Sequence, residues 1–202
     1  MKKFLIKYKH ILPFVIYFPI YMIWFSLLEK NVTEYHIIHC VLDDYIPFVE
    51  YFVIPYYMWF AYVVISIGIA FFTDKTEYFK TVAFLITGMT VFLIVSTVYP
   101  NGLALRPPAY ERDNFCTALC QKLYGVDTST NVLPSIHVYN SVGCMICLFR
   151  CQTTRNKIWV RIISAVLTIL IILSTMFIKQ HSVWDVVTAL LMAVIVYFIV
   201  YK

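Results

Sequence analysis

The sequence has little charge. Charged residues make up 13% of its 202 residues, against roughly 25% in a typical soluble domain. Hydrophobic residues make up 61%, so too few polar side chains remain to cover the surface of a water-soluble fold of this length. The composition therefore excludes a soluble enzyme, a disordered chain, a coiled coil and a nucleic-acid-binding protein, and it indicates a membrane protein.

The sequence also lacks internal repeats, low-complexity tracts and polar linkers, which predicts a single domain over residues 1–202. Its long apolar runs approach the ~20 residues that a helix needs to cross a bilayer core, and they are continuous instead of alternating, which excludes a β-barrel. No small-x-small cleavage site follows the first run, so we expect a helix there and not a removed signal. The predicted fold is all-α, a polytopic bundle of six transmembrane helices at residues 11–28, 51–73, 81–98, 134–150, 161–178 and 182–201.

The placement of Lys and Arg predicts the orientation of these helices. With both termini in the cytoplasm, 11 of the 16 cationic residues lie inside, as the positive-inside rule requires. The net charge of +5 then reflects membrane topology and not a nucleic-acid surface. Residues 29–50 and 99–133 become long outer segments, and loops of that length are usually functional or disordered. Five cations remain outside: Lys30, Arg106, Arg112, Lys122 and Lys179.

The outer end of the fourth predicted helix offers groups that suit an anion. A helix start carries free N–H groups and a partial positive charge, which favour phosphate. Here Ser135 adds a hydroxyl, Ile136 a backbone N–H and His137 an imidazole. The alternative is an ordinary Pro-Ser helix start with an interfacial histidine.

The outer end of the sixth predicted helix carries a second histidine. His181 and Asp185 are four residues apart and share a helix face. The carboxylate can accept Nδ1–H, which leaves Nε2 free as a nucleophile, and an unpaired Asp near the bilayer would be costly. Lys179 stands next to this pair and can neutralise an oxyanion, and Arg106 in the outer loop can grip phosphate. A capping pair, an interfacial anchor and a solvated turn are the structural alternatives.

Together, Arg106-Pro107, Pro134-Ser135-x-His137 and His181-x3-Asp185 resemble the motifs of the type-2 phosphatidic acid phosphatase superfamily, which includes lipid phosphate phosphatases and vanadium haloperoxidases. The family pattern is Lys-x6-Arg-Pro, Pro-Ser-Gly-His and Ser-Arg-x5-His-x3-Asp. This chain has Tyr99, Ile136 and Thr175 where the family has Lys, Gly and Arg. Lys179, with Arg112 or Lys122, is the expected replacement for the missing cations. A third motif without its Arg is similar to sphingomyelin and inositol phosphorylceramide synthases.

The resemblance implies a mechanism without metal or cofactor. His181 is the nucleophile that forms a phosphohistidine, Asp185 orients it, and His137 is the general acid and base. The phosphate-binding groups implied are Arg106, Ser135, the Ile136 N–H and Lys179, with Arg112 as a further candidate. The implied function is a lipid phosphate phosphatase acting on a phosphomonoester or pyrophosphate, with a lipid phosphotransferase as the alternative and a non-enzymatic carrier as the second alternative.

The composition, the cation count and the resemblance together imply a location and partners. The protein is expected in the cell membrane, with its active site on the extracytoplasmic face and a membrane lipid phosphate as substrate, and with no nucleic acid. The oligomeric state is open.

Asp43 and Asp44 are expected to form a solvated acidic turn, with a headgroup amine or polyol as the alternative ligand. Cys116 and Cys120 lie outside, where a disulfide is an open question, and Cys144, Cys147 and Cys151 have a spacing that indicates packing and not a metal site.

Overall fold

The computed structural model describes residues 9–31 and 34–202, and helices dominate them. The long helices are α2 (Leu12–Asn31), α4 (Val53–Thr73), α5 (Lys75–Val98), α7 (Ile136–Arg150), α8 (Ile158–Phe177) and α9 (Val183–Tyr201). Shorter helices are α3 (Val41–Tyr45) and α6 (Phe115–Val126), with 3-10 turns η1 (Lys9–Ile11) and η2 (Glu50–Phe52). Strands β1 (His36–Ile37) and β2 (Asn101–Gly102) pair in parallel.

Each of the six predicted apolar runs forms a long helix, and five of these are long and apolar enough to cross a membrane: α2, α4 with η2, α5, α8 and α9. The fourth run forms α7, which has 15 residues. The third helix begins at Lys75, six residues before the predicted start, because the Asp74 side chain caps it by accepting from the Glu77 N–H at 3.0 Å.

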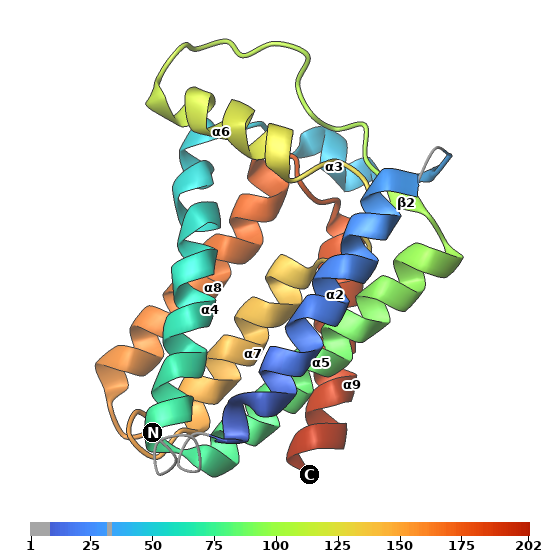
Figure 1. The fold of residues 1–202 in the computed structure, drawn as a ribbon. Coiled ribbons are helices and arrows are strands. Elements are labelled where there is room, and N and C mark those ends of the chain that lie inside the picture. Colours follow the sequence, from blue (N-terminus) through green and yellow to red (C-terminus); the bar gives the residue numbers. More distant parts are fainter. Residues whose placement is uncertain (1–8, 32–33) are drawn as a thin grey trace.

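Helix α7 lies in the middle of the bundle and packs against α4, α5, α8 and α9, whereas α2 lies on the outside and packs on α5 (Figure 1). The α5–α7 contact is close because Gly88 leaves room for the Tyr139 ring. A Cβ at Gly88 would lie 2.0 Å from that ring. Tyr139 is fully buried and donates to the Phe84 carbonyl at 2.8 Å. These contacts therefore fix the position of α7 along α5 and the rotation of α7 about its own axis.

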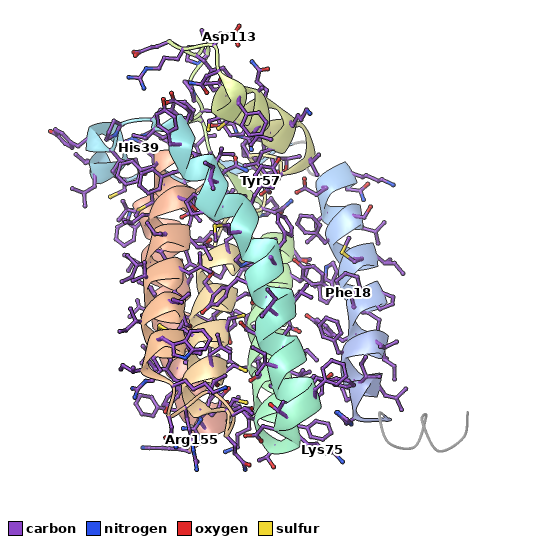
Figure 2. The ribbon with its side chains drawn as sticks, turned by 90° about the vertical axis from the view of Figure 1, so that its left-hand side faces the viewer. Phe18, His39, Tyr57, Lys75, Asp113 and Arg155 are labelled. Carbon is purple, nitrogen blue, oxygen red and sulfur yellow. The ribbon has the colours of Figure 1, made fainter. Side chains whose placement is uncertain are left out.

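The two ends of the bundle differ in character. The start of α2 and the end of α9 lie at one end, while α3, α6 and the loop before α6 cover the other (Figure 1). Figure 2 shows Lys75 and Arg155, both expected inside, at the first end, and His39 and Asp113 at the opposite end. The described parts of the two predicted outer segments thus lie together at this end and form a cap over the bundle, and which end faces the cytoplasm stays a prediction.

The cap is more ordered than the sequence indicated. Helix α6 was not expected within residues 99–133. It begins where the Asn114 side chain accepts from the N–H groups of Cys116 and Thr117. Its apolar face packs on Val53, Tyr56 and Ile178. Cys116 and Cys120 are buried free thiols on this helix, so they form no disulfide.

The expectation of a solvated acidic turn is wrong for Asp43. Its side chain is buried, while Asp44 is exposed. Asp43 accepts hydrogen bonds from the Val183 N–H at 2.8 Å and the Ser182 hydroxyl at 2.6 Å. Two adjacent acidic residues usually indicate an exposed turn. Here Asp43 instead caps α9, the last helix.

Candidate active site

His181 and Asp185 are in contact at the start of α9. Nδ1 of His181 lies 3.2 Å from Oδ2 of Asp185, and the same oxygen accepts from the Ser182 N–H at 2.9 Å. Asp185 is fully buried and His181 is 7% exposed. The ring is therefore held in one orientation, with Nδ1 facing the carboxylate and Nε2 on the opposite side of the ring.

His137 faces His181 from the start of α7. The centroids of the two imidazole rings are 5.8 Å apart. Ser135 is the N-cap of α7 and its hydroxyl accepts from the Val138 N–H at 3.4 Å. Within the described chain, the backbone N–H groups of Ile136 and His137 donate to no protein acceptor. Two free donors therefore stand beside the histidine pair, as an anion site needs.

The start of α9 has no such free donors. The N–H groups of Ser182 and Val183 donate to the carboxylates of Asp185 and Asp43. The Trp184 N–H donates to the Ser182 hydroxyl. Of the two helix starts that the sequence indicated, only that of α7 keeps free N–H groups among the described residues.

Arg106 approaches the site through Gln180 and the backbone of Asp127. Its Nε donates to Gln180 Oε1 at 3.0 Å, and its Nη2 donates to the carbonyl of Asp127 at 2.5 Å. The guanidinium also lies 4.2 Å from the ring centre of Tyr124. Burial lowers the pKa of Arg106, but a guanidinium stays charged at any ordinary pH. Sequence reasoning missed Gln180, whose only signal was a polar side chain beside His181.

The other predicted phosphate-binding cations lie elsewhere. The Lys179 ammonium donates to the carbonyls of Asp43, at 2.8 Å, and Ile46, and burial lowers its pKa. Arg112 pairs with Glu50 at 3.3 Å and is 63% exposed. Lys122 is also exposed. None of these three lines the pocket that holds the two histidines.

The positions that depart from the family pattern do not supply a cation either. Tyr99 stacks on His36 with ring centroids 4.4 Å apart. Thr175 is buried, and its carbonyl accepts from the N–H groups of Gln180 and His181 at 2.9 Å each. Thr175 therefore shapes the turn that presents His181. Arg106 contacts two residues of the pocket wall, Gln180 and Asp127.

The pocket that both histidines line is small, about 30 Å³. Thr128, Thr130 and Asn131 form part of the pocket wall. Their side chains donate hydrogen bonds to Glu29, in the last turn of α2. The complete lining is Phe25, Phe92, Asp127, Thr128, Thr130, Asn131, Val132, Ile136, His137, Gln180 and His181.

Asp127 is a second residue that sequence reasoning missed. Its Oδ2 lies 3.9 Å from Nε2 of His137 and accepts from the Tyr56 hydroxyl. Asp127 directly follows α6, whose existence the sequence did not indicate, so nothing placed it near a histidine. Across residues 9–31 and 34–202, no group of three or more His, Cys, Asp or Glu side chains is arranged to hold a metal ion.

Comparison with known proteins identifies a family. The family model described as PAP2 superfamily matches residues 82–202, more than half of the chain, a stretch that includes Arg106, His137, His181 and Asp185. No curated protein and no solved structure matches the chain.

Proposed function

The chain belongs to the PAP2 superfamily, and from this premise we propose that it is an integral-membrane lipid phosphate phosphatase that works through a phosphohistidine. Membership of the superfamily supports a membrane phosphatase or phosphotransferase. One observation supports the more specific proposal of a phosphohistidine phosphatase. The His181–Asp185 pair faces His137, beside the free N–H groups of Ile136 and His137. Its substrate is a phosphomonoester or pyrophosphate of an amphiphilic lipid.

The first step transfers the phosphoryl group to His181. Its Nε2 lone pair attacks phosphorus and forms the P–N bond while the P–O bond to the lipid breaks. The protonated His137 gives its proton to the leaving oxygen, which departs as an alcohol. Asp185 accepts the Nδ1–H of His181 throughout, and its negative charge stabilises the ring when it becomes cationic.

The second step returns the enzyme to its starting state. His137, now neutral, takes a proton from water as the water oxygen attacks phosphorus. The P–N bond breaks, and its electron pair returns to Nε2 of His181. Inorganic phosphate leaves, and His137 is protonated again for the next cycle.

Charge that accumulates on the equatorial phosphoryl oxygens is offset by the helix start of α7. The N–H groups of Ile136 and His137 are fixed donors there, and such donors stabilise a developing anion without reorganisation. Arg106 adds positive charge behind Gln180 and Asp127. Lys179 and Arg112 are not part of this proposal, because both are engaged with other protein groups.

The proposed site faces the extracytoplasmic side of the cell membrane. The cation count of the loops supports this orientation, because it assigns 11 of the 16 Lys and Arg residues to the cytoplasmic side. The substrate is then a lipid of the outer leaflet.

Phosphate release from purified protein in detergent micelles tests the proposal. We expect release from at least one member of a panel of phosphatidate, isoprenyl phosphates and isoprenyl pyrophosphates, and saturable inhibition by vanadate. His181→Ala abolishes the release while the protein still inserts and folds, and the exposed His39→Ala serves as the matched control. A His181→Ala protein that released phosphate at the wild-type rate would contradict the assignment.

A lipid phosphotransferase is the second candidate, and the charge of the pocket favours it. Asp127 places a carboxylate in the pocket wall, whereas Arg106 is engaged with Gln180 and with backbone carbonyls. A monoanionic phosphodiester suits such a site better than a dianionic phosphomonoester. Adding a lipid alcohol to the assay and following a new phospholipid against free phosphate distinguishes the two functions.

A further inference from the structure

His137 lies in a setting of its own, built by α4 and by the segment after α6. Its ring packs between Tyr56 and Trp59, with centroids 4.6 Å and 4.4 Å away. Oδ2 of Asp127 lies 3.9 Å from Nε2. The Tyr56 hydroxyl oxygen lies 3.4 Å from Nδ1. Each ring nitrogen of His137 therefore has an oxygen atom nearby. Neither oxygen belongs to a residue of the three sequence motifs that resemble the superfamily.

The proton of Tyr56 decides how these groups are arranged. Tyr56 has one O–H proton, and it donates this proton to Oδ2 of Asp127. Its oxygen then has only lone pairs to offer His137, so Nδ1 of His137 carries a proton and donates it to Tyr56. This arrangement leaves Nε2 as the nitrogen of His137 that gains and loses a proton, next to the carboxylate of Asp127.

We propose that Asp127 is the positioning residue of His137 and stabilises its imidazolium form, as Asp185 does for His181. The inference rests on the proposed function, in which His137 is first an acid and then a base. The separation of 3.9 Å is short enough for a charge pair but too long for a hydrogen bond. Asp127 therefore stabilises the positive charge while the Nε2 proton stays available to the leaving oxygen.

Among the residues that the structure describes, no other negatively charged side chain contacts the His137 ring. Tyr56 and Trp59 face it from α4, Asp127 from the segment between α6 and α7, and His181 from the segment before α9. Asp185 lies behind His181 and bonds to that ring. Among the described groups in contact with the His137 ring, Asp127 is the one carboxylate, and it opposes the repulsion that a cationic His181 would exert.

The proton count of the proposed reaction stays balanced with Asp127 charged throughout. In the first step Nε2–H of His137 goes to the leaving oxygen, and in the second step Nε2 takes a proton from water. Asp127 neither gains nor loses a proton in either step. Its effect is to keep His137 protonated over a wider pH range before the first step.

The test is the titration of the His137 ring in protein labelled with [13Cε1]histidine and held in detergent micelles. The chain has five histidines, and His137→Gln identifies the His137 signal by its loss. We expect Asp127→Asn to lower the pH of half-protonation of His137 by about 1 unit or more, the usual effect of losing an opposite charge at this range. Asp127→Glu keeps the charge and retains most of the wild-type value.

The chain offers a matched control for this measurement. His39 and Asp44 form a similar pair at 2.8 Å on the exposed cap, and Asp44 raises the pKa of His39. Asp44→Asn lowers the half-protonation pH of His39 and leaves that of His137 unchanged. In the rate–pH profile, the limb on which activity falls with rising pH moves to lower pH in Asp127→Asn by the same amount as the ring titration, and it stays in place in Asp44→Asn.

An unchanged half-protonation pH of His137 in folded Asp127→Asn overturns the inference, and Asp127→Ser provides the same measurement if the amide variant aggregates. The ring titration needs no substrate. Wild-type protein that released no phosphate and made no new phospholipid would overturn the proposed function, while the titration would still decide whether Asp127 stabilises the cationic ring.

Discussion

The backbone N–H of Ser135 donates to the carbonyl oxygen of Asp185 at 3.2 Å. This bond joins the residue that caps α7 to the residue that contacts His181. The starts of the two helices are therefore fixed to each other by backbone atoms, which no side-chain substitution removes. The bond holds the two helix starts that carry the imidazole rings, so we expect side-chain substitutions at the site to change its chemistry more than its backbone geometry.

Asp185→Asn is the first prediction. The amide keeps the shape of the carboxylate but presents a neutral group to Nδ1 of His181, so the cationic ring loses its partner. We expect kcat to fall by about 10²–10⁴-fold, the range for loss of acid–base assistance or of an orienting carboxylate. Steady-state phosphate release measures it. Asp44→Asn, on the exposed cap, is the matched control and should keep wild-type kcat.

Arg106→Lys is the second prediction. A lysine keeps the charge but cannot donate at once to Gln180 and to the carbonyls of Tyr124 and Asp127. We expect kcat/KM to fall by about tenfold or more, equivalent to about 1.4 kcal/mol, because the pocket wall loses its support. Arg112→Lys, whose partner is Glu50, should leave kcat/KM unchanged. Equal losses in the two variants would argue against a role of Arg106 in the site.

The sequence was sufficient for the parts of the site that depend on local spacing. The contact between His181 and Asp185 follows from their separation of four residues on a helix. The start of α7 at Ser135, which caps the helix through the Val138 N–H, follows from the Pro-Ser sequence there. The six apolar runs indicated the long helices, because continuous hydrophobicity is enough to define them.

The sequence was insufficient where the chain folds back over long distances. Asp127 and Tyr56 are 71 residues apart and meet only because α6 covers the outer end of α4. Lys179 is next to Gln180 in sequence, but its backbone has a positive φ of 54°, and its ammonium contacts the Asp43 loop instead. Charge type alone indicated a phosphate ligand there, whereas the local backbone conformation directs the side chain to a structural role.

Asp43→Ala is the third prediction. The substitution leaves the Val183 N–H and the Ser182 hydroxyl without their acceptor in a buried setting. We expect the free energy of unfolding to fall by about 1–3 kcal/mol, the cost of an unsatisfied buried polar group. Thermal unfolding in detergent, followed by circular dichroism, measures the loss. Asp44→Ala, on the neighbouring exposed residue, should change stability little, and equal losses would show that Asp43 is not the anchor of α9.

Gly88→Ala is the fourth prediction. The new methyl would lie 2.0 Å from the buried Tyr139 ring, so α5 and α7 must separate. Overpacking of this kind costs typically about 1–3 kcal/mol, and we expect a lower unfolding temperature in detergent. Gly68→Ala is the matched control, because a Cβ there meets nothing within 4 Å and alanine favours the helix. A Gly88→Ala protein as stable as Gly68→Ala would contradict the close α5–α7 contact.

Glu29→Gln is the fifth prediction, and it concerns access to the pocket. The pocket that holds the two histidines is small, about 30 Å³, and we expect its wall to move when a phosphoryl group enters. Glu29 accepts from Thr130 and Asn131 in that wall, and an amide loses at least one acceptor. Hydrogen exchange of residues 127–133 should then quicken by about fivefold, equivalent to about 1 kcal/mol. The exposed Glu34→Gln should leave it unchanged, and slow exchange in both variants would mean that α2 does not restrain the wall.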